Sequence, residues 1–433
     1  MSFDEAVKYL LSLGHETLAI KLGLANIERL LAALGNPHRS FPSVQIAGTN
    51  GKGSTAVMLA SICRAAGIRA GLYTSPHLVS ITERIRINGK QIDREEFARL
   101  TARVREAALQ MQNECGALPT FFEQVTALAL LAFQEARVQL AILETGLGGR
   151  LDATTAAGAQ TVAITPIALD HQEYLGHTLV EIATEKAAII RAGVRATVIA
   201  QQQPAALAVI SERCRKQKIE PRFATANYQI HGAETDGRLR ATFRTTHDIY
   251  EDVCLSLRGR HQLTNAAVAI ELAEALREQG FPLTRAAIIE GLETVRHAGR
   301  LELIAGTPSL LFDGAHNPAG ARALRDYLAE FVSAPITLVF GAMSDKDLRE
   351  IAAILFPLAN KLILTRPDNP RAAAIEALAR ALPDDIPAHQ IFQTQDTRMA
   401  WRTALEQTLP HGLICVTGSL YLIGEIKNQL ADE

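Results

Sequence analysis

The sequence predicts an α/β protein with two domains, each built around a mostly parallel sheet. Short apolar, β-branched runs alternate with longer segments whose apolar residues recur at helical spacing, which is typical of β-α-β units. This alternation is interrupted once and starts again near residue 297, and 433 residues are enough for two or three domains. We therefore expect an N-terminal domain at residues 1–296 and a smaller C-terminal domain at residues 297–433, separated by the turn Arg296–Gly299.

The N-terminal domain is expected to be doubly wound. Its strands are predicted at 43–47, 68–74, 139–145, 161–167 and 195–200. Its helices are predicted near 54–66, 94–114, 120–136, 179–191 and 205–217. Because strands and helices alternate along the chain, the crossovers would place helices on both faces of a parallel sheet.

The pattern changes between about Phe223 and Gly259, where polar and apolar residues alternate, as in RLRATFRTTH. Such alternation predicts a small antiparallel excursion, after which a helix resumes at Gln262. A second β-α series follows, with strands predicted at 309–313, 336–340, 361–365 and 412–418. This series predicts a smaller, Rossmann-like C-terminal domain whose first strand ends at Asp313.

The composition excludes several classes of protein. Lys and Arg total 44 against 46 for Asp and Glu, so a formal charge of −2 gives no electrostatic reason for binding nucleic acid. No run approaches the ~20 apolar residues of a membrane span, and Asp4 and Glu5 stand where a secretory signal carries basic residues. We expect a cytoplasmic, soluble monomer. Its five cysteines are never closer than 40 residues in sequence, so we expect reduced, buried thiols rather than zinc ligands.

The segment Gly48–Thr55, GTNGKGST, lies between a predicted strand and a predicted helix. Glycines there allow backbone N–H groups to surround a phosphate, the helix N-terminus adds partial positive charge, and Lys52 supplies a full charge. The usual P-loop spacing is not met, because Ile46 stands where a glycine is needed and Gly53 intervenes before Ser54. The segment therefore predicts a shortened P-loop for a nucleoside triphosphate; an ordinary glycine-rich turn is the alternative.

Polar residues follow three further strands, at Thr74–Leu78, Glu144–Thr154 and Leu169–His171. The carboxyl ends of parallel strands meet at one sheet edge, so these segments predict a single ligand site. Phosphate-bound Mg²⁺ prefers a few hard oxygen ligands, which Ser75 and Glu144 offer. His171 is a less usual magnesium ligand, and a hydrogen-bonded histidine is its alternative interpretation.

These segments, together with Leu175–Thr178 and Glu185–Ala187, resemble the Mur ligase superfamily and, within it, folylpolyglutamate synthase and the bifunctional dihydrofolate synthase. The resemblance covers nearly the whole chain. It implies that ATP is bound by Thr49, Asn50, Gly51, Lys52, Gly53, Ser54, Asn265, Arg300 and Asp313. It implies that Ser75, Glu144 and His171 bind Mg²⁺, and that Lys186 is carbamylated and holds a second Mg²⁺. On pattern alone Lys186 is a solvated helix lysine, and Asn265 is part of a helix cap.

The same resemblance implies a folate side of the site at Thr120, Phe121, Phe122, Glu123, Leu151, Asp152 and Ala153. Adjacent aromatic side chains suit stacking on a flat heterocycle, although two phenylalanines are also ordinary helix core. The resemblance also implies that Ala19–Leu22 contacts the pterin. Lys21 and Thr155 differ from residues usual in the family, which leaves open whether dihydropteroate is a substrate. His316 and Ser419 are expected on the glutamate side, with loop capping as the alternative.

The predicted function is ATP-dependent ligation of L-glutamate to reduced folates, and also to dihydropteroate, through an acyl phosphate. Lys52, Lys186 and His316 are the expected catalytic residues, and His316 and Asp313 are the nearest candidates for a base. A monofunctional folylpolyglutamate synthase or a cell-wall Mur ligase are the alternatives within the superfamily. A GTPase is disfavoured because Ile363 stands where a guanine-reading Asp is needed, and a non-enzymatic nucleotide-binding module is the remaining class.

Overall fold

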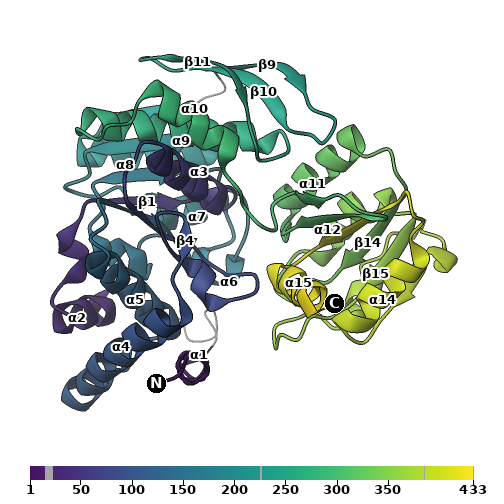
Figure 1. The fold of residues 1–433 in the computed structure, drawn as a ribbon, viewed down its shortest axis with the longest axis horizontal. Coiled ribbons are helices and arrows are strands. Elements are labelled where there is room, and N and C mark those ends of the chain that lie inside the picture. The colour runs from purple at the N-terminus through teal and green to yellow at the C-terminus, as the bar shows by residue number, and fades with distance from the viewer. Residues whose placement is uncertain (15–22, 225–226, 385, 433) are drawn as a thin grey trace.

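The computed structural model describes residues 1–14, 23–224, 227–384 and 386–432. Figure 1 shows two α/β parts side by side, with a small antiparallel sheet along one edge of the first. We refer to the elements from α1 to α10 as the N-terminal part and to those from β12 to α15 as the C-terminal part. The predicted fold class is confirmed, whereas Ala19–Leu22 lies outside the described residues.

The N-terminal part contains an eight-stranded sheet in the order β4-β3-β2-β5-β1-β6-β7-β8. Its strands are β1 (Ser43–Ala47), β2 (Ala70–Tyr73), β3 (Ile85–Ile87), β4 (Lys90–Gln91), β5 (Leu140–Glu144), β6 (Thr161–Ile164), β7 (Ala196–Ala200) and β8 (Pro221–Ala224). Six neighbouring strands of this sheet pair in parallel, in the order β2-β5-β1-β6-β7-β8. At one edge, β3 pairs antiparallel with β2, and β4 pairs antiparallel with β3. Strands β1, β5 and β6 are buried along their whole length, which explains their continuous apolar runs.

Helices cover both faces of this sheet. They are α1 (Phe3–Ser12), α2 (Ala25–Ala33), α3 (Lys52–Ala65), α4 (Arg94–Cys115), α5 (Phe121–Glu135), α6 (Gln172–Leu175), α7 (Leu179–Ala187), α8 (Pro204–Gln217), α9 (His261–Glu278) and α10 (Arg285–Thr294). Alternate residues of one strand serve different faces: Ile142 of β5 packs with α3 and α9, whereas Leu143 packs with α4 and α5. This two-sided burial confirms the doubly wound prediction.

The antiparallel excursion is a three-stranded sheet of β9 (Tyr228–Ala233), β10 (Leu239–Arg244) and β11 (Ile249–Cys254), in the order β11-β10-β9. The predicted start of this excursion was wrong by a few residues. Phe223 and Ala224 belong to β8, which pairs in parallel with β7 and extends the large sheet.

The C-terminal part has a six-stranded sheet in the order β12-β13-β17-β14-β15-β16. Its strands are β12 (Glu302–Ile304), β13 (Ser309–Asp313), β14 (Ile336–Phe340), β15 (Lys361–Leu364), β16 (Ile391–Gln393) and β17 (Leu413–Thr417). Its helices are α11 (Pro318–Phe331), α12 (Leu348–Leu355), α13 (Ile375–Arg380), α14 (Thr397–Gln407) and α15 (Leu420–Asp432). Asp313 therefore ends the second strand of this sheet and not the first, because the short β12 precedes it in an antiparallel pair.

All five cysteines are free thiols, as predicted, but not all are buried. Cys115 is exposed because it is the last residue of α4, and Cys254 at the end of β11 is only half-buried. Cys63, Cys214 and Cys415 are buried within the apolar cores. Among the described residues, no helix is long and apolar enough to cross a membrane.

Candidate active site

The phosphate-binding loop leads from β1 into α3, which begins at Lys52, two residues earlier than predicted. Gly51 precedes the helix with a φ of 86°, and a Cβ at this position would lie 2.1 Å from Oδ1 of Asn265. Only glycine therefore suits both the backbone angle and the close approach of α9. The Thr49 and Asn50 N–H groups donate to the carbonyl of Pro166, at 3.0 and 3.2 Å, which fixes the loop against the segment after β6.

Lys52 points back over the loop, and its Nζ donates to the carbonyls of Gly48 and Thr49 at 3.0 and 3.1 Å. Burial lowers the pKa of Lys52, while the carboxylates of Glu144 and Asp170 oppose that shift. The ammonium group thus lies at the helix N-terminus, where a phosphate would find one full charge and several N–H groups.

A buried network of polar side chains joins α3, the helix after the phosphate-binding loop, to α9 and to the segment between the two parts. Gln262 receives a hydrogen bond from Asn265 at 2.8 Å and approaches Oγ of Ser54 at 3.4 Å. On its other side, Oγ of Ser54 lies 3.3 Å from Nδ1 of His297. Burial holds the pKa of His297 well below its usual value, with further lowering by Arg300, so the ring is neutral. Ser54 and Asn265 are therefore both fixed by neighbours.

Arg300 and Asp313 lie where the C-terminal part meets this loop. The Asp313 carboxylate accepts the N–H groups of Leu301 and Ala315, at 2.9 and 3.0 Å, and Arg300 donates to the carbonyl of Gly314 at 3.2 Å. Burial raises the pKa of Asp313, although Arg300 lowers it. Both carboxylate oxygens already accept hydrogen bonds, so Asp313 orders the turn after β13.

The arrangement of Glu144, Ser75 and His171 shows whether a divalent cation fits the site. In the described part of the chain, no three His, Cys, Asp or Glu side chains are arranged to hold a metal ion. Oε2 of Glu144 accepts the Ser75 N–H at 3.2 Å, and Nδ1 of His171 is buried with no hydrogen-bond partner. Burial lowers the pKa of His171 to about 3, so the ring is neutral, the form in which a histidine can bind a metal ion. Such a sparse set fits Mg²⁺, which takes most of its ligands from phosphate and water.

Lys186 lies in the last turn of α7 and is 4% exposed, so it is not the solvated lysine that its sequence context suggests. Its Nζ donates to the carbonyl of Gly48 at 2.8 Å. Burial lowers its pKa to about 7, and the charge of Lys52 adds to this effect. A large fraction of the amine is therefore neutral near physiological pH, which is the form that reacts with carbon dioxide.

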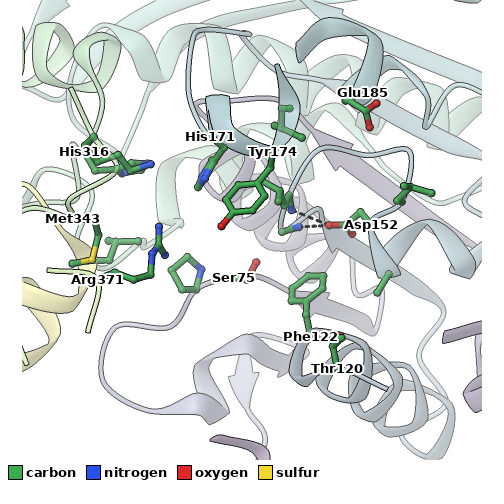
Figure 2. Close-up of a pocket in the computed structure, with 18 of the residues that line it drawn as sticks. Ser75, Thr120, Phe122, Asp152, His171, Tyr174, Glu185, His316, Met343 and Arg371 are labelled. Atoms are coloured by element: carbon green, nitrogen blue, oxygen red, sulfur yellow. Dashed lines mark hydrogen bonds between the residues drawn. The ribbon is translucent and has the colours of Figure 1, made fainter. Parts of the chain in front are cut away.

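The residues expected to bind ATP and metal surround one cavity of about 340 Å³ between the two parts. Its lining includes Thr49, Asn50, Gly51, Lys52, Gly53, Ser54, Ser75, Glu144, His171, Lys186, Asn265, Arg300, Asp313 and His316. A second cavity of about 230 Å³ shares Ser75, Gly146, His171 and His316 with the first. Figure 2 shows this second cavity, with His316, Met343 and Arg371 across from Ser75, Phe122 and His171.

The predicted folate side lies in the second cavity, except for Phe121. Thr120 and Glu123 form a capping box at the start of α5, with the Thr120 N–H donating to Oε2 of Glu123 at 2.7 Å. Phe122 points into the cavity, whereas Phe121 is 3% exposed and packs in the core under Arg84. The two rings lie on different faces of the helix, so only Phe122 is placed to stack on a ligand.

Asp152 organises the loop that carries Leu151 and Ala153 along the cavity wall. Its Oδ2 accepts the N–H groups of Gly146 and Leu147, both at 2.9 Å, as Figure 2 shows. Burial raises the pKa of Asp152, although hydrogen bonds from Thr154 and from these N–H groups lower it. Its hydrogen bonds are all made within the loop, so the carboxylate shapes the wall.

Thr155, which differs from the family pattern, is buried behind this wall. Its hydroxyl accepts from Gln45 at 2.7 Å and donates to the carbonyl of Gly149 at 2.7 Å. The substitution therefore changes the packing of the loop rather than a side chain on the cavity wall.

His316 and Ser419 both line the second cavity. Nδ1 of His316 lies 2.8 Å from the carbonyl of Gly314, and its Nε2 lies 3.5 Å from Oδ2 of Asp170. Both ring nitrogens face acceptors, so the ring is placed to donate. Oγ of Ser419 accepts the Tyr421 N–H at 3.1 Å, which is a capping contact.

Among the cavity residues that sequence reasoning missed, Met343, Lys346 and Arg371 come from the C-terminal part. They follow β14 and β15, so the strand-end rule that identified the first sheet's residues would also have found them in the second sheet.

The fold and this site define a Mur ligase. The family model of the Mur ligase middle domain matches residues 46–273, and that of the Mur ligase glutamate ligase domain matches residues 299–420. The chain is therefore an ATP-dependent ligase.

Similarity to curated proteins shows to which family within the Mur ligases this chain belongs. A dihydrofolate synthase/folylpolyglutamate synthase of Bacillus subtilis is 34% identical over 96% of this chain and 97% of its own length. A probable bifunctional folylpolyglutamate synthase/dihydropteroate synthase of Halobacterium salinarum is 36% identical, but the chain spans only 52% of its length. The chain belongs to the folylpolyglutamate synthase/dihydrofolate synthase family.

Solved structures show the same fold. Folylpolyglutamate synthase of Mycobacterium tuberculosis, complexed with ADP, has a TM-score of 0.92 and 31% identity, covering 100% of this chain and 98% of its own. A bifunctional folylpolyglutamate synthase/dihydrofolate synthase with Mn, AMPPNP and L-glutamate bound has a TM-score of 0.85 and 29% identity, with coverage of 100% and 98%.

Proposed function

We propose that this protein transfers the γ-phosphoryl group of ATP to a carboxylate of a folate and joins the activated carboxylate to the α-amine of L-glutamate. Reduced folates that carry glutamate are the first class of acceptor, and dihydropteroate is the second. The products are an amide, ADP and phosphate. We also propose that the protein acts as a monomer.

The observation that carries this proposal is the junction of the two cavities. Ser75, Gly146, His171 and His316 line both, so a nucleotide over the phosphate-binding loop and a flat ring beside Phe122 would meet there. Bringing the γ-phosphoryl group and the carboxylate together in this way supplies much of the rate enhancement of a phosphoryl transfer.

The nucleotide is held between the two parts. Gly51, Gly53 and Ser54 supply backbone and hydroxyl donors for the phosphates, and Lys52 stabilises charge on the transferred oxygens. Thr49 and Asn50 line the nucleotide cavity and shape the loop, because their N–H groups donate to Pro166. Asn265, Arg300 and Asp313 line the same cavity and would contact the nucleotide from α9 and from the C-terminal part. We place the domain boundary at residues 296–297, because α10 ends at Thr294 and β12 begins at Glu302.

Two magnesium ions complete the site in this proposal. Ser75, Glu144 and His171 would hold the first, and carbamylated Lys186 would hold the second. When bound, the ions neutralise charge on the phosphates. The support from this chain is the unpartnered Nδ1 of His171, the buried Glu144 carboxylate and the buried, partly neutral Lys186 amine.

The amine of glutamate attacks the acyl carbon, and phosphate leaves. Both expected bases are already engaged, because each oxygen of Asp313 accepts an N–H group and both nitrogens of His316 face oxygens. We therefore assign no side-chain base, and His316 lines the glutamate side of the cavity with its ring held by Gly314 and Asp170.

The experiment is ADP release by the purified protein with Mg²⁺, ATP and L-glutamate, with either tetrahydrofolate or dihydropteroate as the acceptor. Turnover with both acceptors is expected, and omission of glutamate should abolish product. Turnover with tetrahydrofolate alone would restrict the activity to polyglutamylation. The absence of glutamate-dependent ADP release with both acceptors would overturn the proposal.

A further inference from the structure

We propose that Lys346 is a positioning residue for the ligation reaction: by pairing with Asp170 it holds the C-terminal part of the site against the N-terminal part. This inference rests on the proposed function. Lys346 lies in the loop between β14 and α12, and Asp170 lies between β6 and α6, directly before His171. Nζ of Lys346 and Oδ1 of Asp170 are 2.7 Å apart.

The Asp170 carboxylate contacts three side chains of the C-terminal part. Besides Lys346, its Oδ2 accepts Nδ2 of Asn317 at 3.1 Å and faces Nε2 of His316 at 3.5 Å. Its Oδ1 also accepts the His171 N–H at 2.9 Å. One buried carboxylate thus connects a candidate metal ligand of the first part with three donors of the second.

Apart from Asp170, few groups near Lys346 can compensate the charge of its ammonium group. The side chains of Lys346 and Asp170 are 6% and 7% exposed, and the other acceptor of the ammonium group is Asp345, at 3.4 Å. Asp345 is shared with Arg371, whose Nη2 lies 2.9 Å from its Oδ1. Arg371, which lines the second cavity, Asp345, Lys346 and Asp170 therefore form a chain of ion pairs in which positive and negative charges alternate. Removing one member of a buried pair leaves the other uncompensated, so the pair favours contact between the parts.

Asn317 extends the same connection to the nucleotide loop. Its Oδ1 caps α11 by accepting the Gly320 N–H at 2.8 Å, which turns its amide nitrogen toward the N-terminal part. That nitrogen donates to Oδ1 of Asn50 and to Oδ2 of Asp170, both at 3.1 Å. Loss of the Lys346 pair would therefore also loosen the contact between α11 and the phosphate-binding loop.

A second ion pair between the two parts offers a matched control. Arg260 and Glu330 lie 2.7 Å apart, but their side chains are 53% and 33% exposed. Water screens such a pair, so breaking it should matter little. Glu330→Gln therefore removes a bridging ion pair without removing a buried charge from the site.

The test compares Lys346→Met, Lys346→Arg and Glu330→Gln in the full chain. We measure kcat, KM for each substrate, the Kd of AMPPNP and the radius of gyration by X-ray scattering, with and without ligands. Lys346→Met is expected to lower kcat roughly 10²-fold through misplacement of reacting groups, with AMPPNP Kd changed less than about threefold and a larger liganded radius. Lys346→Arg should restore most of kcat, and Glu330→Gln should match the unchanged protein.

Two results would overturn the inference. A folded Lys346→Met variant with normal kcat would remove any positioning role. A large loss of kcat with an unchanged liganded radius and no rescue by arginine would mean that Lys346 acts on the substrate directly. If the unchanged protein itself ligates neither acceptor, the proposed function fails, while the scattering comparison with AMPPNP still tests the contact.

Discussion

Replacement of Gly146 by alanine tests the placement of the folate acceptor beside Phe122. Gly146 has a backbone that alanine can adopt, since its φ is not in the left-handed region. A Cβ there would lie 2.5 Å from Cζ of Phe122, against an ordinary contact distance of 3.4–4 Å, so the ring has to move by about 1 Å. Because the ring tip can move, the fold should survive.

The expected result of Gly146→Ala is a rise of about 10-fold in KM for tetrahydrofolate, which corresponds to about 1.4 kcal/mol, the upper range of an aromatic contact. The Kd of AMPPNP should stay within about twofold, because the displaced Phe122 ring lines the folate cavity and is not part of the lining of the nucleotide cavity. Gly232→Ala is the matched control, since Gly232 also lacks a left-handed φ and a Cβ there meets nothing within 4 Å. An unchanged KM, or equal weakening of nucleotide and folate, would refute the placement of Phe122.

Three further predictions concern the phosphate and metal groups. Lys52→Ala should lower kcat by roughly 10²–10³-fold in the ADP-release assay, and retention of more than about a tenth of the activity would argue against its role in phosphoryl transfer. Activity in bicarbonate buffer should rise as pH increases through about 7, since the neutral amine of Lys186 becomes more abundant above its pKa. Lys186→Ala should abolish that rise, and native mass spectrometry of the unchanged protein in bicarbonate should show a carbamate, whose absence would refute the modification. His171→Ala should raise the Mg²⁺ concentration for half-maximal activity by about 10–100-fold, whereas a shift in ATP affinity alone would point to a nucleotide contact.

The periodic elements of the fold were predictable because each depends on local patterning. The strands at 43–47, 161–164 and 309–313 are short, mostly apolar runs, and the glycine-rich loop identified the first crossover. The short strands Ile85–Ile87 and Glu302–Ile304 were missed, since three residues carry too little pattern to distinguish a strand from a loop.

The site was predictable only in part. Motifs after strands indicated Lys52, Glu144 and His171, which line one cavity in the structure. Patterning could not separate Phe121 from Phe122, because their different surroundings depend on how α5 packs. Nor could it indicate the Lys346–Asp170 pair, whose members are 176 residues apart in sequence and meet only when two separate sheets come together.

The most direct measurement follows oxygen from the folate to the phosphate. The protein is given ATP, Mg²⁺, L-glutamate and tetrahydrofolate labelled with oxygen-18 in its side-chain carboxylates, and the phosphate and folate products are analysed by mass spectrometry. Activation as an acyl phosphate predicts one labelled oxygen in each phosphate released and a folate that has gained a glutamyl residue. Unlabelled phosphate with no glutamylated product would show that this site hydrolyses ATP without activating the folate carboxylate.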